Sequence, residues 1–357
     1  MPHVPPDIIQ NVLESTYYTK GFTPDYATLR SSSLVCKAWK DYSQKLLFHD
    51  VRLHRYHDHP GMVSFRSAVF ASTQRGRTLA SYIRRTDIII GVQADVNLTV
   101  DDLLGLVSHC HGLYAVTLRV PGIHEFGPSM MEGLRRAHEA SLPTPIRSLS
   151  LLLCGTQSPI LYQLLAVWPS IQYLRVGTEL AAPPPIEPNK VQLYELTLFR
   201  EPPLAHVEWL LSASKNTLRI LECVVAPGSE YDHLLQDLGK HLLSLRIFRH
   251  TRRFAAVVQF CPELKEIVIT QLSSFLPLGD LPPTLEHLSF RSMSAVATIP
   301  LQPIISAIGN LPKLRLVSCD ASKRNVDFAS LSEKCQEKGA ILLTGLLPIR
   351  LVSAAAE

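Results

Sequence analysis

Four histidines lie close together near the start of the chain and raise the question of a zinc site. They are His49, His54, His57 and His59. Imidazole is a frequent zinc ligand, but no cysteine or carboxylate completes a fixed ligand geometry around these four. The pattern favours an exposed polar loop after a first strand, and we expect no metal.

The other reactive side chains form no recognisable catalytic pattern. Cys110 lies between His109 and His111, and a cysteine at a helix end more often packs as a small hydrophobe. The chain has no G-x-S-x-G, no cysteine in a His-bearing catalytic signature and no phosphate-binding glycine loop. The basic runs Arg84–Arg85 and Arg246–Arg253 could contact an acidic partner, but we expect them to form a solvated face. We therefore expect a protein that is not an enzyme and has no cofactor.

The composition indicates a folded protein without a nucleic-acid or membrane partner. Of the 357 residues, 46% are hydrophobic and 18% are charged, and the net charge of +4 is too mild for a phosphate-binding surface. No apolar run is long enough to cross a membrane, and Pro348 and Arg350 interrupt the nearest approach to one, residues 341–356, which we interpret as a last strand and a tail. Seven scattered cysteines and the lack of a secretory signal favour reduced thiols and a cytoplasmic or nuclear location.

The first fifty residues read as three short helices. Pro6 suits the first position of one helix, and Thr23 before Pro24 and Asp25 starts a second, running to about Leu34. A third runs from Cys36 to about Leu47, where Val35, Trp39, Tyr42 and Leu46 recur on one face. Roughly forty residues bury too little surface to be stable alone, so this head should pack against a neighbour.

The residues of this head resemble the F-box family. The resemblance rests on Val4-Pro5-Pro6-Asp7-Ile8-Ile9, Leu13, Leu34-Val35-Cys36-Lys37-x-Trp39 and Leu46-Leu47-Phe48. It implies that the head binds a Skp-family adaptor and, through it, a cullin. The implied contact residues are Pro6, Ile8, Ile9, Leu13, Val35, Cys36 and Trp39. The alternative is that the helices only cap a repeat array.

An apolar spacing, apolar-x-x-apolar-x-apolar, recurs through the rest of the chain. Its eleven starts are Phe48, Ile83, Leu113, Ile146, Ile171, Leu193, Leu218, Leu242, Leu264, Leu285 and Leu314. The starts lie 21 to 35 residues apart, close to the length of one leucine-rich repeat of a strand and a helix. Helical runs are expected at residues 103–110, 206–212, 231–238, 252–261 and 301–308, and a loop at the proline-rich insert 181–189.

The repeats resemble the leucine-rich-repeat family in a degenerate form. The predicted fold class is therefore α/β, with an all-α F-box-like head at residues 1–50 joined without a flexible linker to an irregular solenoid at residues 51–357. The solenoid should carry a parallel sheet on its concave side.

Strand alternation predicts a binding surface on that sheet. With Leu196 and Leu198 inward, the outward residues are Glu195, Thr197 and Phe199. Applied to neighbouring strands, the register gives three columns: Phe199, Val224 and Phe248; Tyr173 and Ile220; and Arg175, Glu222 and Arg246 between them. Such an apolar patch crossed by charges is typical of a protein-binding surface, unless the proline-rich loop or the C-terminal tail covers it.

These features together predict a substrate receptor of a Skp-cullin-F-box ubiquitin ligase, whose repeats bind an unidentified target protein. A repeat scaffold with no tie to ubiquitin is the alternative, and adaptor binding separates the two.

Overall fold

We describe a computed structural model of the chain, which defines residues 5–18, 24–140, 145–272, 278–279, 281–291, 301–320 and 325–345. The chain divides into two compact units, Met1–Val191 and Gln192–Glu357. The head therefore belongs to the first unit, and a domain boundary after residue 50 stays a prediction. None of the helices in the described ranges combines the length and apolarity needed to cross a membrane.

The head consists of three helices, as the sequence predicts. They are α1 Pro6–Ser15, α2 Tyr26–Ser32 and α3 Lys37–Leu47. Pro6 occupies the start of α1, where its missing N–H costs no hydrogen bond. Asp25 caps α2 by accepting a hydrogen bond from the backbone N–H of Thr28 at 3.0 Å. The predicted signals at Val4 and Thr23 lie outside the described residues.

A small apolar core holds the head together. Ile9, Leu13, Tyr17 and Leu29 are buried in it, and the partly buried Trp39, Tyr42, Leu46 and Leu47 pack against it. The predicted apolar face of the third helix is therefore used inside the head, with one exception. Val35 precedes the N-cap residue Cys36 and is 64% exposed, so it lies outside that face.

The head continues directly into the first strand. Helix α3 ends at Leu47 and β1 begins at Asp50, and α3 also contacts α5. The Tyr26 hydroxyl donates to the backbone carbonyl of Asp50 at 2.8 Å. The carbonyl of His49 accepts from the backbone N–H groups of Arg84 and Arg85, which fixes the start of β1 against β2.

The first unit continues as strand–helix repeats. Its strands are β1 Asp50–Leu53, β2 Arg85–Ile89, β3 Ala115–Arg119, β4 Ser148–Leu153 and β5 Tyr173–Val176. Its further helices are α4 Pro60–Val69, α5 Gln74–Tyr82, α6 Val100–His109, α7 Pro128–Ala140 and α8 Ile160–Val167. The strands pair in parallel and in chain order.

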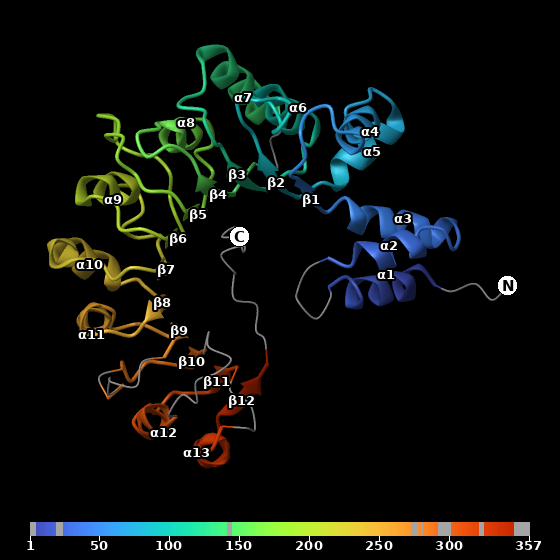
Figure 1. Ribbon diagram of the computed structural model, residues 1–357. Coiled ribbons are helices and arrows are strands. Elements are labelled where there is room, and N and C mark those ends of the chain that lie inside the picture. The colour runs from blue at the N-terminus through green and yellow to red at the C-terminus, as the bar shows by residue number, and fades with distance from the viewer. Residues whose placement is uncertain are drawn as a thin grey trace. The chain divides into compact units, whose positions relative to one another are not determined.

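The second unit has the same construction. Its strands are β6 Glu195–Leu198, β7 Ile220–Cys223, β8 Ser244–Arg249, β9 Glu266–Gln271, β10 His287–Phe290, β11 Leu316–Cys319 and β12 Ile341–Thr344. Its helices are α9 Leu204–Leu211, α10 Asp232–Gly239, α11 Arg252–Gln259, α12 Gln302–Gly309 and α13 Phe328–Lys338, with a 3₁₀ turn at Ser229–Tyr231. All neighbouring strands pair in parallel. The helices lie on one face of these strands and leave the other face without helices (Figure 1).

The repeat spacing predicted every one of the first eleven strands, and each begins two residues after its predicted start. The reason is visible in one repeat, where Leu242, Leu245 and Ile247 are all buried. The first residue of the spacing enters the core just before the strand, and alternation then turns the next two inward. The α/β repeat architecture is confirmed, as are the five predicted helical runs and the loop at 181–189.

We expect Leu29→Ala to destabilise the head by about 2–5 kcal/mol, because it removes a fully buried side chain from a small core. Urea unfolding, with hydrogen exchange of the α1–α3 amides, measures the loss. Ile8→Ala in the same head, at a side chain that is 49% exposed, should change stability by no more than about 0.5 kcal/mol. Equal losses for the two variants would contradict the assigned core.

Candidate functional site

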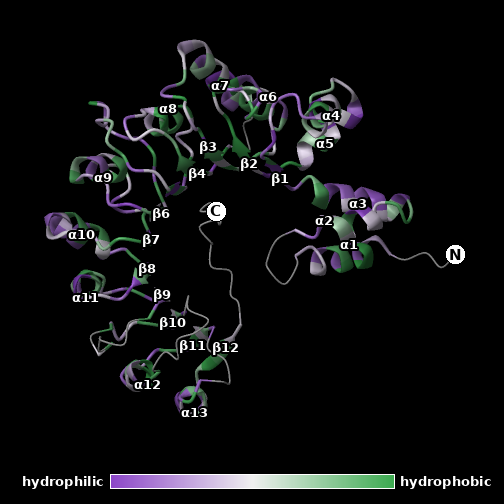
Figure 2. Ribbon diagram, in the orientation of Figure 1, coloured by the Kyte–Doolittle hydropathy of each residue, from purple (hydrophilic) through white to green (hydrophobic). Residues whose placement is uncertain are grey.

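The head exposes apolar side chains on α1 and in the connection from α2 to α3. On α1, Ile8 and Val12 are one helical turn apart and point outward. In the connection from α2 to α3, Leu34, Val35 and Cys36 are exposed in succession. Figure 2 shows hydrophobic residues along α1, whereas α3 is largely hydrophilic. We call these five residues, with the exposed Pro6, the head surface.

Three of the seven residues predicted to contact an adaptor do not belong to the head surface. Ile9 and Leu13 are buried in the core, and Trp39 is half-buried against it. Ile9 points about 100° away from Ile8 around α1 and enters the head core, whereas Ile8 stays exposed. The prediction of Ile9 and Leu13 as direct contacts is corrected, because both are buried and hold the head together. Trp39 packs against that core and keeps part of its surface exposed, so its contact with an adaptor stays a prediction.

The second unit brings six of the predicted target-binding residues onto the helix-free face of its sheet. Ile220 on β7 lies between Glu195 and Ser244, and Glu222 lies between Thr197 and Arg246. The paired residues Leu198, Cys223 and Ile247 are the last of these pairings. Phe199, Val224 and Phe248 each come directly after one of them. We call Phe199, Ile220, Glu222, Val224, Arg246 and Phe248 the sheet patch. Every member is half-buried and keeps part of its surface exposed.

The remaining two predicted residues lie in the first unit. Tyr173 and Arg175 are on β5, where they pair in register with Ser148 and Ser150 of β4. Both are half-buried, and the alternate residues Leu174 and Val176 are buried. Their outward register is as predicted.

Two residues predicted to be outward are in fact buried. Glu195 and Thr197 on β6 have almost no exposed surface. Thr197 donates its hydroxyl to Glu222 at 3.2 Å, and a guanidinium nitrogen of Arg246 lies 3.8 Å from the Glu195 carboxylate. Glu222 on β7 and Arg246 on β8 therefore interact with these two residues on the sheet face.

A hydrogen-bonded network extends from the sheet patch across β8, β9 and β10. Arg246 Nε lies 3.3 Å from Glu266, which also accepts from the Ser244 hydroxyl, and His287 Nδ1 lies 3.0 Å from the same carboxylate. The His287 hydrogen bond is the main reason that the pKa of Glu266 falls to about 2, with further lowering by Ser244 and Arg246 against the opposing effect of burial. The network therefore holds Glu266 ionised.

His287 also connects Glu266 to a serine in an arrangement that resembles a hydrolase triad. Its Nε2 lies 2.9 Å from Ser318 Oγ, and its Nδ1 faces the carboxylate. However, Ser318 is only 1% exposed, and its strand β11 is paired on both sides, so the nearby backbone N–H groups serve the sheet. The hydroxyl therefore bridges strands and is not presented to a substrate.

The predicted histidine loop contributes to two ion networks in the first unit. His57 Nδ1 lies 2.7 Å from Asp102, which also accepts from Arg66 at 2.9 Å. Burial alone would raise the pKa of Asp102, but hydrogen bonds from His57, Thr99 and Arg66 outweigh it and lower the pKa. His54 similarly lies 3.0 Å from Asp87. These histidines thus pair with carboxylates of later repeats, and the described residues include no group of three or more suitable side chains that could hold a metal.

The basic runs are also tied into the fold. Arg84 donates to the carbonyl of Gly112 at 3.1 Å, and Arg253 donates to the carbonyl of Gly228 and to the carboxylate of Asp232. Arg246 and Arg253 are partly buried, whereas Arg84, Arg85, Arg249 and Arg252 are exposed, so the expected solvated face is present only in part.

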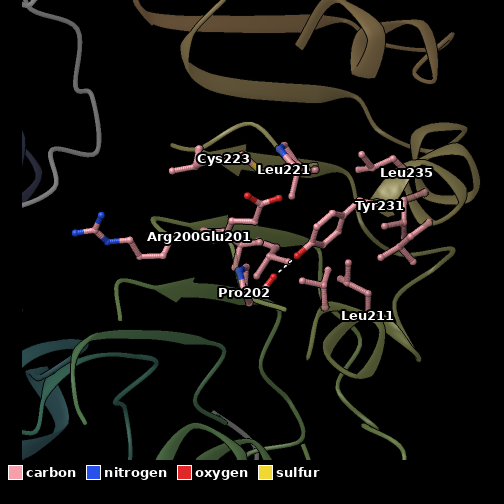
Figure 3. Close-up of a pocket in the computed structure, with 15 residues that line it drawn as sticks. Arg200, Glu201, Pro202, Leu211, Leu221, Cys223, Tyr231 and Leu235 are labelled. Atoms are coloured by element: carbon pink, nitrogen blue, oxygen red, sulfur yellow. Dashed lines mark hydrogen bonds between the residues drawn. The ribbon is translucent and has the colours of Figure 1, made fainter. Parts of the chain in front are cut away.

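One cavity of about 30 Å³ lies between the strands and helices of the second unit. It is lined mainly by leucine and valine, and the Tyr231 hydroxyl at its edge donates to the carbonyl of Pro202 (Figure 3). Burial raises the pKa of the Cys223 thiol at its wall to about 12, which leaves it protonated and unreactive. The space holds about one water, so we regard it as a packing gap.

Comparisons with known proteins give only weak likenesses. No protein-family model matches the chain, and no curated protein matches it. Among solved structures, the leucine-rich repeat-containing protein LegL7 from Legionella pneumophila has a TM-score of 0.43 and 14% identity, over 83% of this chain and 90% of that chain. The yeast Rad7–Elc1 complex has a TM-score of 0.35 and 12% identity, over 94% of this chain and 92% of that chain. The repeat architecture is therefore established by the strands and helices of this chain itself.

The low pKa of Glu266 predicts acid-sensitive stability. Because the folded-state pKa is about 2 and the ordinary value is 4.5, the stabilisation is complete above about pH 4.5 and is lost as the pH falls toward 2. Glu266→Gln should remove this contribution, which is on the order of 3 kcal/mol. Urea unfolding at pH 7 and pH 3 measures the effect. The exposed Glu263→Gln serves as the control, and a pH dependence in Glu266→Gln equal to that of the wild type would refute the assignment.

Proposed function

We propose that this protein is a non-catalytic substrate receptor of a Skp-cullin-F-box type ubiquitin ligase. In this proposal the head surface docks a Skp-family adaptor, which links the protein to a cullin, and the sheet patch binds the protein to be modified. The ligase chemistry resides in other subunits. Such a receptor would work in the cytoplasm, the nucleus or both.

The observation that carries the proposal is the exposed apolar surface of the head. Val35 is 64% exposed and Leu34 more so, although a module with this small a core can afford few apolar side chains in water. The residues fall in the segment that resembles the F-box family. A docked adaptor would remove them from water and thereby also stabilise the head.

The sheet patch supports the second half of the proposal. Phe199, Val224 and Phe248 are half-buried apolar side chains, and the partly exposed charges of Glu222 and Arg246 lie beside them. Apolar side chains with a few charges give a partner both buried area and a fixed orientation.

A scaffold without a link to ubiquitin remains the second candidate, because the head also contacts the first repeat. The Tyr26–Asp50 hydrogen bond and the contact between α3 and α5 would suit a cap that only closes the array. A cap needs no adaptor, so adaptor binding distinguishes the two functions.

We expect Val35→Glu to weaken adaptor binding at least tenfold, because a carboxylate would be buried in an apolar interface. Binding of purified full-length protein to a recombinant Skp-family adaptor can be measured by titration calorimetry. Val92→Glu changes an exposed valine elsewhere in the first unit and should bind like the wild type. Wild-type protein that is folded yet does not bind the adaptor would favour the cap. Trp39 is a poor probe, since its truncation would also disturb the head core.

For the sheet patch, we expect the double variant Phe199→Ser and Phe248→Ser to lose its target while keeping its adaptor. A photo-crosslinking amino acid at position 224 would trap the target in cells, and mass spectrometry would identify it. The double variant should trap none of that protein and should unfold within about 1 kcal/mol of the wild type, because both rings are only half-buried. A loss of several kcal/mol would mean that the rings belong to the core.

A further inference from the structure

The stretch between β5 and β6 departs from the repeat pattern. Residues 177–194 contain neither helix nor strand, although a helix joins the strands in most other repeats. Within this stretch, residues 183–188 have the sequence Pro-Pro-Pro-Ile-Glu-Pro. The function proposed above makes no use of this loop.

The loop is hydrogen-bonded to a preceding repeat at its start and is buried at its end. At its start, the backbone N–H groups of Ala181 and Ala182 donate to the carbonyl of Thr156 at 2.8 and 3.2 Å, and the buried Tyr162 donates its hydroxyl to the carbonyl of Ala182 at 2.9 Å. At its end, Asn189 is buried and its side-chain oxygen accepts from the backbone N–H of Val191 at 3.2 Å.

Between these anchors every residue is exposed except Pro184, which is half-buried. Ile186 has a relative exposure of 105%, so its side chain is as accessible as in an isolated extended peptide. Pro183, Pro185 and Pro188 are exposed as well. A large apolar side chain that contacts nothing, carried on a loop that is fixed at both ends, is well placed to be covered by a partner.

The prolines also set the backbone conformation of the loop. Each proline fixes φ near −65° and restricts the residue before it to extended conformations, so Ala182, Pro183 and Pro184, each followed by a proline, favour the polyproline II region. The chain then bends at Ile186 and Glu187. The loop thus consists of a triproline arm with an exposed isoleucine at its tip, and Pro188 lies beyond the bend.

We infer that Pro183–Ile186 is a docking peptide for a domain with an aromatic-lined groove of the SH3, WW or EVH1 type. Such grooves bind preformed polyproline II segments, because the rings pack on the proline faces and little conformational entropy is lost on binding. The four residues carry no charge, and prolines have no N–H to hydrogen-bond, so recognition would come from ring packing and from donors to the proline carbonyls. The partner would therefore differ from both an adaptor and a target held by the sheet patch.

The test uses the full-length chain, fluorescently labelled, on an array of purified SH3, WW and EVH1 domains. We expect the wild type to bind at least one domain. Replacing Pro183, Pro184 and Pro185 together by Ala should raise the dissociation constant at least tenfold, and Ile186→Ser should raise it severalfold. The matched control, Pro188→Ala beyond the bend, should change it less than twofold.

Thermal unfolding accompanies each variant, and Ile186→Ser serves as the variant that cannot disturb packing, because its side chain contacts nothing. A wild type that binds no domain on the array, or a triple variant that binds as well as the wild type, would overturn the inference. Equal weakening by Pro188→Ala and the triple variant would overturn the assignment to the triproline arm. None of these outcomes depends on adaptor binding, which is measured separately.

Discussion

The parallel pairing of neighbouring strands in one register is the constraint on which the rest of each unit depends. A parallel strand must return through a crossover before its neighbour can begin, so each repeat needs a connection on one face of the sheet. Helices on that face bury the inward side chains, such as Leu245 and Ile247 of β8. The other face is left to residues that a strand places outward at every second position. The surface that carries the sheet patch is therefore a consequence of how the core is built.

The same register explains which parts of the structure the sequence could predict. Strand starts follow from a local spacing of apolar residues, so all eleven predicted strands are present. Helix α8 was not predicted, because Ile160, Leu161, Tyr162, Leu164 and Leu165 are all buried and leave no amphipathic period to detect. The burial of Glu195 and Thr197 was missed for a different reason. Their surroundings are side chains from β7 and β8, more than twenty residues away, and no local pattern reports them.

In the head, too, the sequence alone could not predict which apolar residues are buried. The sequence located its three helices closely, because proline and capping residues act within one turn. It could not separate Ile8 from Ile9, since both are apolar and adjacent, and only the packing of α1 against the other helices decides which one is buried. Residues that a motif groups together thus divide into those that hold the head and those that remain open to a partner.

The polar network lowers the desolvation cost that a partner would incur by covering the sheet patch. Arg246 is already paired with Glu266 and lies near Glu195, so its charge is largely compensated before any partner arrives. A partner that covers this region need not supply a new counter-ion for Arg246, which lowers the desolvation cost of the contact. Recognition then depends on the half-buried apolar side chains Phe199, Val224 and Phe248, while Glu222, tied to Thr197 alone among the described contacts, is the charge most open to a partner. Shape and apolar area would accordingly provide most of the affinity, and the position of the remaining carboxylate would select among partners.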